Sequence, residues 1–129
     1  MPIDYFLSVF KENKSKNAIF WKDNYYTYNY LIEEFERCKL WITENYITSG
    51  NVVAVEGDFS PKAISLLLAL IDTKCIIIPL TKSVKNKIDE FCEVSQAEIV
   101  INIDEDDNLE RSNLNGKPNN KLYHHRDVD

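Results

Sequence analysis

The 129-residue chain is poor in the residues that mark specialised classes of protein. Only 3 Gly and 4 Pro occur, which excludes a collagen-like or glycine-rich chain. The three cysteines, Cys38, Cys75 and Cys92, form no Cys-x-x-Cys pair, and an odd number argues against a disulfide framework. We therefore expect buried thiols and a reducing, cytoplasmic compartment.

Long apolar runs and strong positive charge are also missing. The most apolar stretch, Ile64–Ile71, is far shorter than the ~20 residues of a membrane span. No basic segment of a signal peptide follows Met1. The net charge is −6, and the short group Lys82, Lys85 and Lys87 is diluted by acidic neighbours, as on a solvated helix face. We therefore predict neither a membrane nor a nucleic-acid partner.

Apolar residues make up 44% of the chain, enough for one domain with a real core. Three apolar runs that do not alternate with polar residues are Val52–Val55, Cys75–Ile78 and Ile99–Ile101. Such runs, separated by helical patterns, are typical of a parallel sheet covered on both faces. The sequence therefore predicts an α/β fold with a parallel βαβαβ core and right-handed crossovers.

A helix and a hairpin are predicted before this core. Apolar residues at helical spacing run from Ile3 to Phe10. Ala18–Trp21 and Tyr25–Tyr28 are strand-like runs on either side of a turn at Asp23-Asn24. The chain is thus expected to open with a short helix followed by two antiparallel strands.

Further helices are predicted from their caps. Thr27 is the predicted N-cap of a long helix, which is expected to end at Ser49-Gly50. Ser60-Pro61 begins a helix that continues to about Thr73 and is apolar on nearly every face, and Ser83 begins another. The buried face of the long helix is expected to hold Leu31, Phe35, Cys38, Ile42 and Tyr46.

The composition changes after residue 103. Asp104–Asp107 is an acidic run, and residues 113–120 are rich in Asn, with a Gly and a Pro. We therefore divide the chain into an N-terminal α/β subdomain, residues 1–103, and an acidic, mostly irregular tail, residues 104–129.

Three segments could bind a ligand, but each also has a simpler structural explanation. The turn Glu56–Pro61 could hold phosphate at a helix N-terminus, but its two carboxylates would repel an anion, so helix capping is preferred. Asp104–Asp107 could hold Mg²⁺, yet a solvated acidic loop is preferred. His124-His125 with Asp127 and Asp129 could bind a metal, although histidines near a terminus usually lie in solvent.

Two further groups are given structural roles. Glu33 and Glu34 beside Arg37 are explained by solvated charge pairing on a helix, without catalysis. An aromatic group is assigned to the packing of the hairpin on a helix rather than to nucleic-acid stacking; it consists of Tyr25, Tyr26, Tyr28 and Tyr30.

Three segments together carry a family resemblance. Tyr26–Leu31 resembles Leu-Thr-Tyr-x-Glu-Leu, and Leu70–Leu80 resembles Leu-Lys-Ala-Gly-x-x-Tyr-Val-Pro-Leu. Between them, Ser49–Val55 matches Gly-Asp-x-Val-Ala. In this order the segments resemble the N-terminal segment of the AMP-forming acyl-adenylating superfamily, which includes acyl-CoA synthetases, peptide-synthetase adenylation domains and luciferases. The resemblance extends over residues 3–103.

The chain departs from the family pattern at two turns. Tyr30 stands in place of the Glu that would complete a capping box with Thr27. Lys74 replaces a Gly at a helix-to-strand turn, which implies an altered or strained turn. Pro79, which the pattern shares, is expected to end a strand at the edge of the sheet.

The resemblance implies an enzyme that adenylates a carboxylate with ATP and passes the acyl group to CoA or a carrier thiol. ATP, Mg²⁺ and CoA are implied for the full-length family only. The sequence has no Ser/Thr/Gly-rich loop ending in Pro-Lys and no counterpart of the family's catalytic Lys, so no catalytic, cofactor-binding or metal-binding residue is assigned. We expect a ligase fragment that is inactive alone and is completed by the remainder of the ligase, in cis or as a partner chain.

Other interpretations remain open. The chain could be a free-standing, non-catalytic α/β module that binds a partner or forms a homodimer through exposed apolar surface. It could also be a small receiver-like or flavodoxin-like domain that uses the acidic loop.

Overall fold

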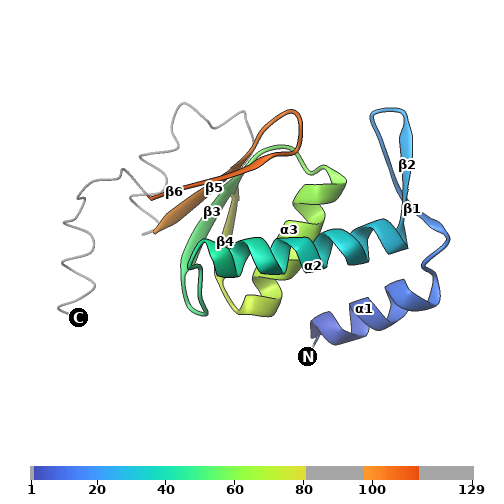
Figure 1. Cartoon of the computed structure of the whole chain (residues 1–129), viewed down its shortest axis with the longest axis horizontal. Helices are drawn as coiled ribbons and strands as arrows, with labels where there is room; N and C mark the ends of the chain where they lie inside the picture. The colour runs from blue at the N-terminus through green and yellow to red at the C-terminus, as the bar shows by residue number, and fades with distance from the viewer. Residues whose placement is uncertain (1, 81–97, 114–129) are drawn as a thin grey trace. The chain divides into compact units, whose positions relative to one another are not determined.

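A computed structural model describes residues 2–80 and 98–113 of the chain (Figure 1). The helix predicted from Ser83, Cys92 and the His124-His125 pair lie outside these residues. The three described helices and a hairpin form one compact unit, and a four-stranded sheet forms the other. The elements are α1 (Pro2–Glu12), β1 (Asn17–Trp21), β2 (Asn24–Thr27), α2 (Tyr28–Glu44), β3 (Val52–Glu56), α3 (Pro61–Thr73), β4 (Ile76–Leu80), β5 (Ile99–Ile103) and β6 (Leu109–Asn113).

The sheet has the strand order β4-β3-β5-β6. Strand β3 is parallel to β4 on one side and to β5 on the other, as the three apolar runs predict. Consecutive residues of β3 and β5 are buried, and successive side chains in a strand point to opposite faces, so both faces of the sheet are buried at its centre. Ala54, Leu80 and Val100 form one cluster of this core.

The edge strand β4 differs from the prediction in its length. Pro79 does not stop the strand, which continues through Leu80. Pro79 lies beside Val55 in the parallel ladder, and β4 has a neighbour on one side only in the described sheet. Proline lacks an N–H, but it is tolerated at an edge because the outer side of such a strand requires no ladder donor.

A correction concerns residues 109–113, which lie in the segment predicted to be mostly irregular but form a strand. Strand β6 pairs antiparallel with β5, so that Ile103 lies opposite Leu109. Asp107 adopts a φ of 64° in the connecting turn, and its N–H donates to Asp104 O at 3.0 Å. This is a tight hairpin of the kind in which Asp tolerates the left-handed conformation. The sequence does not reveal β6 because a half-exposed edge strand needs only one large apolar residue, Leu109.

The long helix α2 begins as predicted. Thr27 is the N-cap, and its Oγ1 accepts the N–H of Tyr30 at 3.1 Å. Four of the five residues assigned to the apolar face are buried: Leu31, Phe35, Cys38 and Ile42. The helix then ends at Glu44, well before Ser49-Gly50, and Tyr46, the fifth of those residues, is 85% exposed.

Both α2 and α3 end in the same hydrogen-bonded turn. In α2 the N–H of Tyr46 donates to Thr43 O and the N–H of Ile47 donates to Ile42 O, both at 3.1 Å. This pair of bonds is the Schellman motif, in which the residue after the cap takes a positive φ. Tyr46 has a φ of 59°, so the chain turns away there and Ile47 becomes the next buried residue.

Lys74 occupies the corresponding position after α3. Its N–H donates to Ile71 O at 2.9 Å, and the N–H of Cys75 donates to Leu70 O at 3.1 Å. Lys74 adopts φ 69° and ψ 40°, the left-handed conformation that glycine takes most readily. The turn is therefore unaltered in form, and the lysine bears the strain.

Helix α3 also begins as predicted and packs against α2 (Figure 1). Ser60 Oγ accepts the N–H of Ala63 at 3.1 Å, and Pro61 occupies the first turn. Ser65 Oγ donates to Leu31 O of α2 at 3.4 Å and to Pro61 O at 3.1 Å. Ile71 is 44% exposed, so the helix is less completely buried than its composition suggests.

Replacing Lys74 with glycine is expected to stabilise the chain. Lys74→Gly removes the left-handed strain and should raise the free energy of unfolding by about 0.5–1 kcal/mol. Urea denaturation followed by tryptophan fluorescence measures the change. The matched control is Lys11→Gly in the last turn of α1, which should lower the free energy of unfolding by a similar amount. If both substitutions lower the free energy of unfolding, Lys74 does not adopt the left-handed conformation after α3.

Gly57 and Gly50 provide a second matched pair. Both have positive φ, +151° and +89°, but a Cβ at Gly57 would lie 2.9 Å from the Cβ and the carbonyl O of Ile103, whereas Gly50 has open space. Gly50→Ala should therefore cost only the backbone strain, about 1 kcal/mol. Gly57→Ala should cost about 1–3 kcal/mol more, because the added methyl group overpacks the end of β5. If both substitutions lower the free energy of unfolding in urea by the same amount, Gly57 does not approach Ile103 as closely as the structure indicates.

Candidate functional site

The carboxyl ends of β3, β4 and β5 lie at one edge of the sheet, where open α/β sheets usually bind ligands. Glu56 is in register with Leu80 on one side and Asn102 on the other. The segments at this edge, residues 56–58 and 102–108, contain five Asp or Glu beyond Glu56 and no Lys or Arg. The described segments at this edge therefore contribute negative charge, which disfavours phosphate.

Gly57 serves packing at this edge rather than anion binding. Its N–H donates to Leu80 O at 3.2 Å. Its Cα faces Ile103 so closely that any Cβ would collide with that residue. The glycine therefore lets the chain leave β3 between the ends of β4 and β5, which explains Gly57 without a phosphate. Glu56, the preceding residue, is only 7% exposed.

Asp104 is held by its own turn. Its Oδ1 accepts the N–H groups of Asp106 at 2.8 Å and Asn108 at 2.9 Å, and its Oδ2 accepts Nδ2 of Asn108 at 3.3 Å. These bonds, the backbone N–H of Asn108 first, lower the pKa of the Asp104 carboxyl. Within residues 2–80 and 98–113, no group of three His, Cys, Asp or Glu is placed to hold a metal ion. The acidic run thus has a local structural role in the β5–β6 hairpin.

The hairpin is expected to weaken in acid through Asp104. The pKa of Asp104 is lower in the folded chain than its ordinary value of 3.8, so the carboxylate stabilises the turn fully above pH 3.8. This stabilisation is lost as the pH falls through the pKa of the folded state. Amide hydrogen exchange of Asp106 and Asn108 measures the effect. Asp104→Ala should lower the protection factors of both amides at pH 7 and abolish their acid dependence, whereas Glu110→Ala, which removes an exposed carboxylate of β6, should change the protection factors little. Wild-type protection factors that stay constant from pH 5 to pH 2 would contradict these bonds.

A correction concerns Glu34, which is buried rather than solvated. Its side chain is 9% exposed, pairs with Arg37 one turn further along α2, and lies 3.8 Å from Lys62 Nζ of α3. Glu34 Oε1 has no hydrogen-bond partner, so the Lys62 charge is what compensates it. The pair joins two helices of the same unit and exposes no nucleophile. The helical spacing does distinguish the two acids, since Glu34 is three residues after Leu31 and four before Cys38, beside the buried face of α2.

The cysteines are poorly suited to nucleophilic chemistry. Burial raises the pKa of Cys38 to about 12, although the nearby Lys62 lowers it. Burial also raises the pKa of Cys75, whose Sγ donates to Thr48 O at 3.5 Å. The thiolate is the reactive form, so neither thiol is activated near neutral pH. Both are free cysteines in the part of the chain that the structure describes.

Thiol labelling provides a direct check of this burial. Iodoacetamide at pH 8 should modify half-buried Cys75 faster than buried Cys38, because the Cys38 thiolate becomes abundant only near pH 12. Mass spectrometry of proteolytic peptides resolves the two sites. Labelling in urea supplies the control, since both sites should then react at similar rates. Native labelling of Cys38 as fast as in urea would contradict the packing of α2.

Tyr26 and Tyr30 pack the hairpin on a helix, in agreement with their assignment, whereas Tyr25 is 66% exposed. The rings of Tyr26 and Tyr30 lie 4.9 Å apart and join the hairpin to the first turn of α2. Tyr28 packs on Phe10 of α1, with 5.1 Å between the ring centroids. Tyr25 pairs with Phe20 across the hairpin at 4.7 Å.

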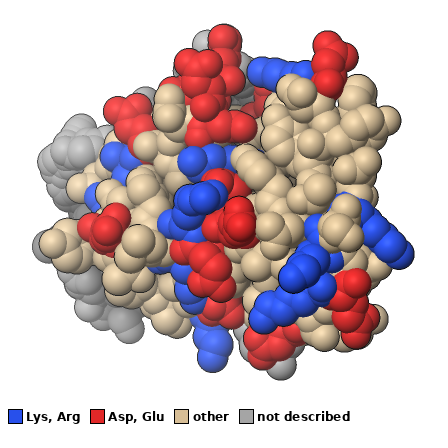
Figure 2. All heavy atoms as spheres, turned by 45° about the vertical axis from the view of Figure 1, so that its right-hand side comes forward, with Lys and Arg blue, Asp and Glu red and all other residues tan. Residues whose placement is uncertain are grey.

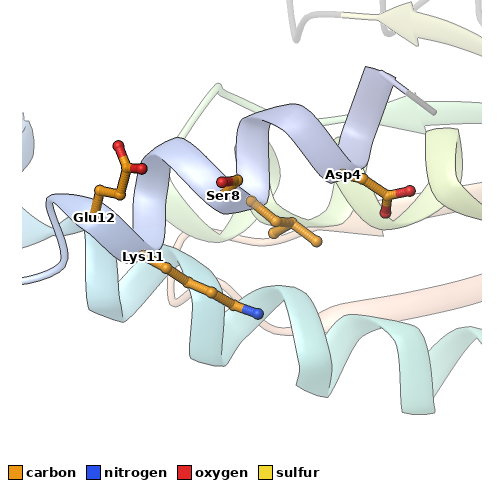
Figure 3. Close-up of a pocket in the computed structure, with 5 residues that line it drawn as sticks. Asp4, Ser8, Lys11 and Glu12 are labelled. Carbon is orange, nitrogen blue, oxygen red and sulfur yellow. The ribbon is translucent and has the colours of Figure 1, made fainter.

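A pocket that the sequence did not indicate lies along α1 (Figure 3). It has a volume of about 460 Å³ and is lined by side chains three and four positions apart: Asp4, Leu7, Ser8, Lys11 and Glu12. All of them except half-buried Leu7 are exposed. An exposed lining of mixed charge provides neither an activated base nor a desolvated nucleophile.

Charge on the visible surface is mixed as well. On the face drawn in Figure 2, acidic and basic side chains are interspersed. The described helices are too short or too polar to cross a lipid bilayer. The Lys82, Lys85 and Lys87 group and the histidine pair with Asp127 and Asp129 lie outside the described residues, so their assignments remain predictions.

Comparison with known proteins identifies the fold. No family model and no curated protein matches the chain. Klebsiella oxytoca NpsA in complex with 3-hydroxyanthranilyl-AMSN matches with a TM-score of 0.72 and 22% identity, over 79% of this chain and 21% of that chain. The N-terminal subdomain of NpsA matches with the same score and identity, over 80% of this chain and 27% of that one. VinN in complex with L-aspartate matches with a TM-score of 0.71 and 15% identity, over 81% of this chain and 30% of that chain.

These likenesses confirm the predicted architecture. The chain has the fold of the N-terminal part of adenylation domains, as the three sequence segments indicated. A further match is NpsA–ThdA, an artificially fused adenylation–PCP di-domain. The chain spans between 20% and 30% of the length of the matching NpsA, NpsA–ThdA and VinN chains.

Proposed function

We propose that this chain is the opening segment of an AMP-forming acyl-adenylating enzyme and supplies part of its sheet scaffold. The observation that carries the proposal is the extent of the fold match. About four-fifths of this chain superposes on a fifth to three-tenths of adenylating proteins, with TM-scores of 0.71–0.72. The order of the segments Tyr26–Leu31, Ser49–Val55 and Leu70–Leu80 supports it from the sequence.

The chemistry of the described residues supports a scaffold rather than a catalyst. The carboxyl edge of the sheet is acidic, Gly57 packs against Ile103, and Asp104 caps its own turn. A nucleotide triphosphate needs cations and backbone donors to hold its phosphates. We therefore assign the groups that bind ATP and Mg²⁺ to polypeptide beyond these residues, in cis or as a partner chain.

In the assembled enzyme, the carboxylate of an acid would attack ATP, forming an acyl adenylate and releasing pyrophosphate. The acyl group would then pass to CoA or to a carrier thiol, with release of AMP. The similar proteins are bound to chemically different molecules, 3-hydroxyanthranilyl-AMSN in NpsA and L-aspartate in VinN. An assay must therefore offer both aryl acids and amino acids.

ATP–pyrophosphate exchange tests the proposal. The chain alone should show no exchange with benzoate, anthranilate or L-aspartate above the rate without protein. Co-expression with the product of the next open reading frame should give exchange if that product carries the phosphate-binding loop. Exchange by the isolated chain would overturn the scaffold role.

The glycine pair supplies the control for complementation. Gly57→Ala should reduce exchange by the co-expressed pair because it disturbs the end of the sheet, whereas Gly50→Ala should retain most of it. Loss of exchange with both variants would indicate a general folding defect rather than a scaffold that depends on this edge.

The alternative is a free-standing interaction or homodimerisation module. Exposed aromatic residues favour it, among them Phe20 at 58% and Tyr25 at 66%. It becomes the better explanation if the downstream product neither binds the chain nor yields exchange with it. A flavodoxin-like domain is less well supported, since β6 is antiparallel to β5 where that fold continues in parallel.

A further inference from the structure

We draw no further inference here: the strongest candidate, the exposed ring pair of Phe20 and Tyr25 on one face of the β1–β2 hairpin, is an apolar patch for which nothing in the structure shows what covers it.

Discussion

The parallel pairing of β3 with β4 and β5 is the interaction on which the rest of the sheet depends. Five residues of β3 pair with β4 and four pair with β5, so the strand has neighbours on both sides along nearly its whole length. Its carboxyl end can lie between two others only if the chain leaves without a side chain there. Gly57 meets that requirement, since its N–H reaches Leu80 O while its Cα faces Ile103.

The same edge limits what the chain can do chemically. Ligands of open α/β sheets bind where strands end, yet the described residues there contribute carboxylates and close packing. Negative charge repels phosphate, and Ile103 occupies the space beside Gly57 where a side chain would otherwise lie. The described residues thus form a fold typical of adenylating proteins, and those at this edge contribute packing and carboxylates, which supports the proposed scaffold role.

The sequence predicted the fold where local signals and core patterns agree. Thr27 and Ser60 act as N-caps at the expected positions, because a hydroxyl before a helical pattern satisfies a backbone N–H wherever the helix lies. The sequence prediction failed at the C-terminus of α2, which closes in a Schellman turn without a glycine. Tyr46 continues the apolar period of α2, but the helix has already ended and Ile47 takes the buried position.

The candidate site was less accessible to sequence reasoning than the fold. The acidic run was recognised, but not the turn in which Asp104 binds Asp106 and Asn108, because that turn exists only when β6 returns along β5. Glu34 was recognised as paired, but its burial depends on where α3 places Lys62.

Caps and unalternating apolar runs were enough to predict the starts of α2 and α3, the three parallel strands and the family likeness. Only the tertiary structure decided that Gly57 is needed for a close approach, that β6 extends the sheet and that Glu34 is covered. The physical reason is that a close contact, a strand pair and a buried charge each need a second segment brought from far along the chain, and no residue specifies that neighbour alone.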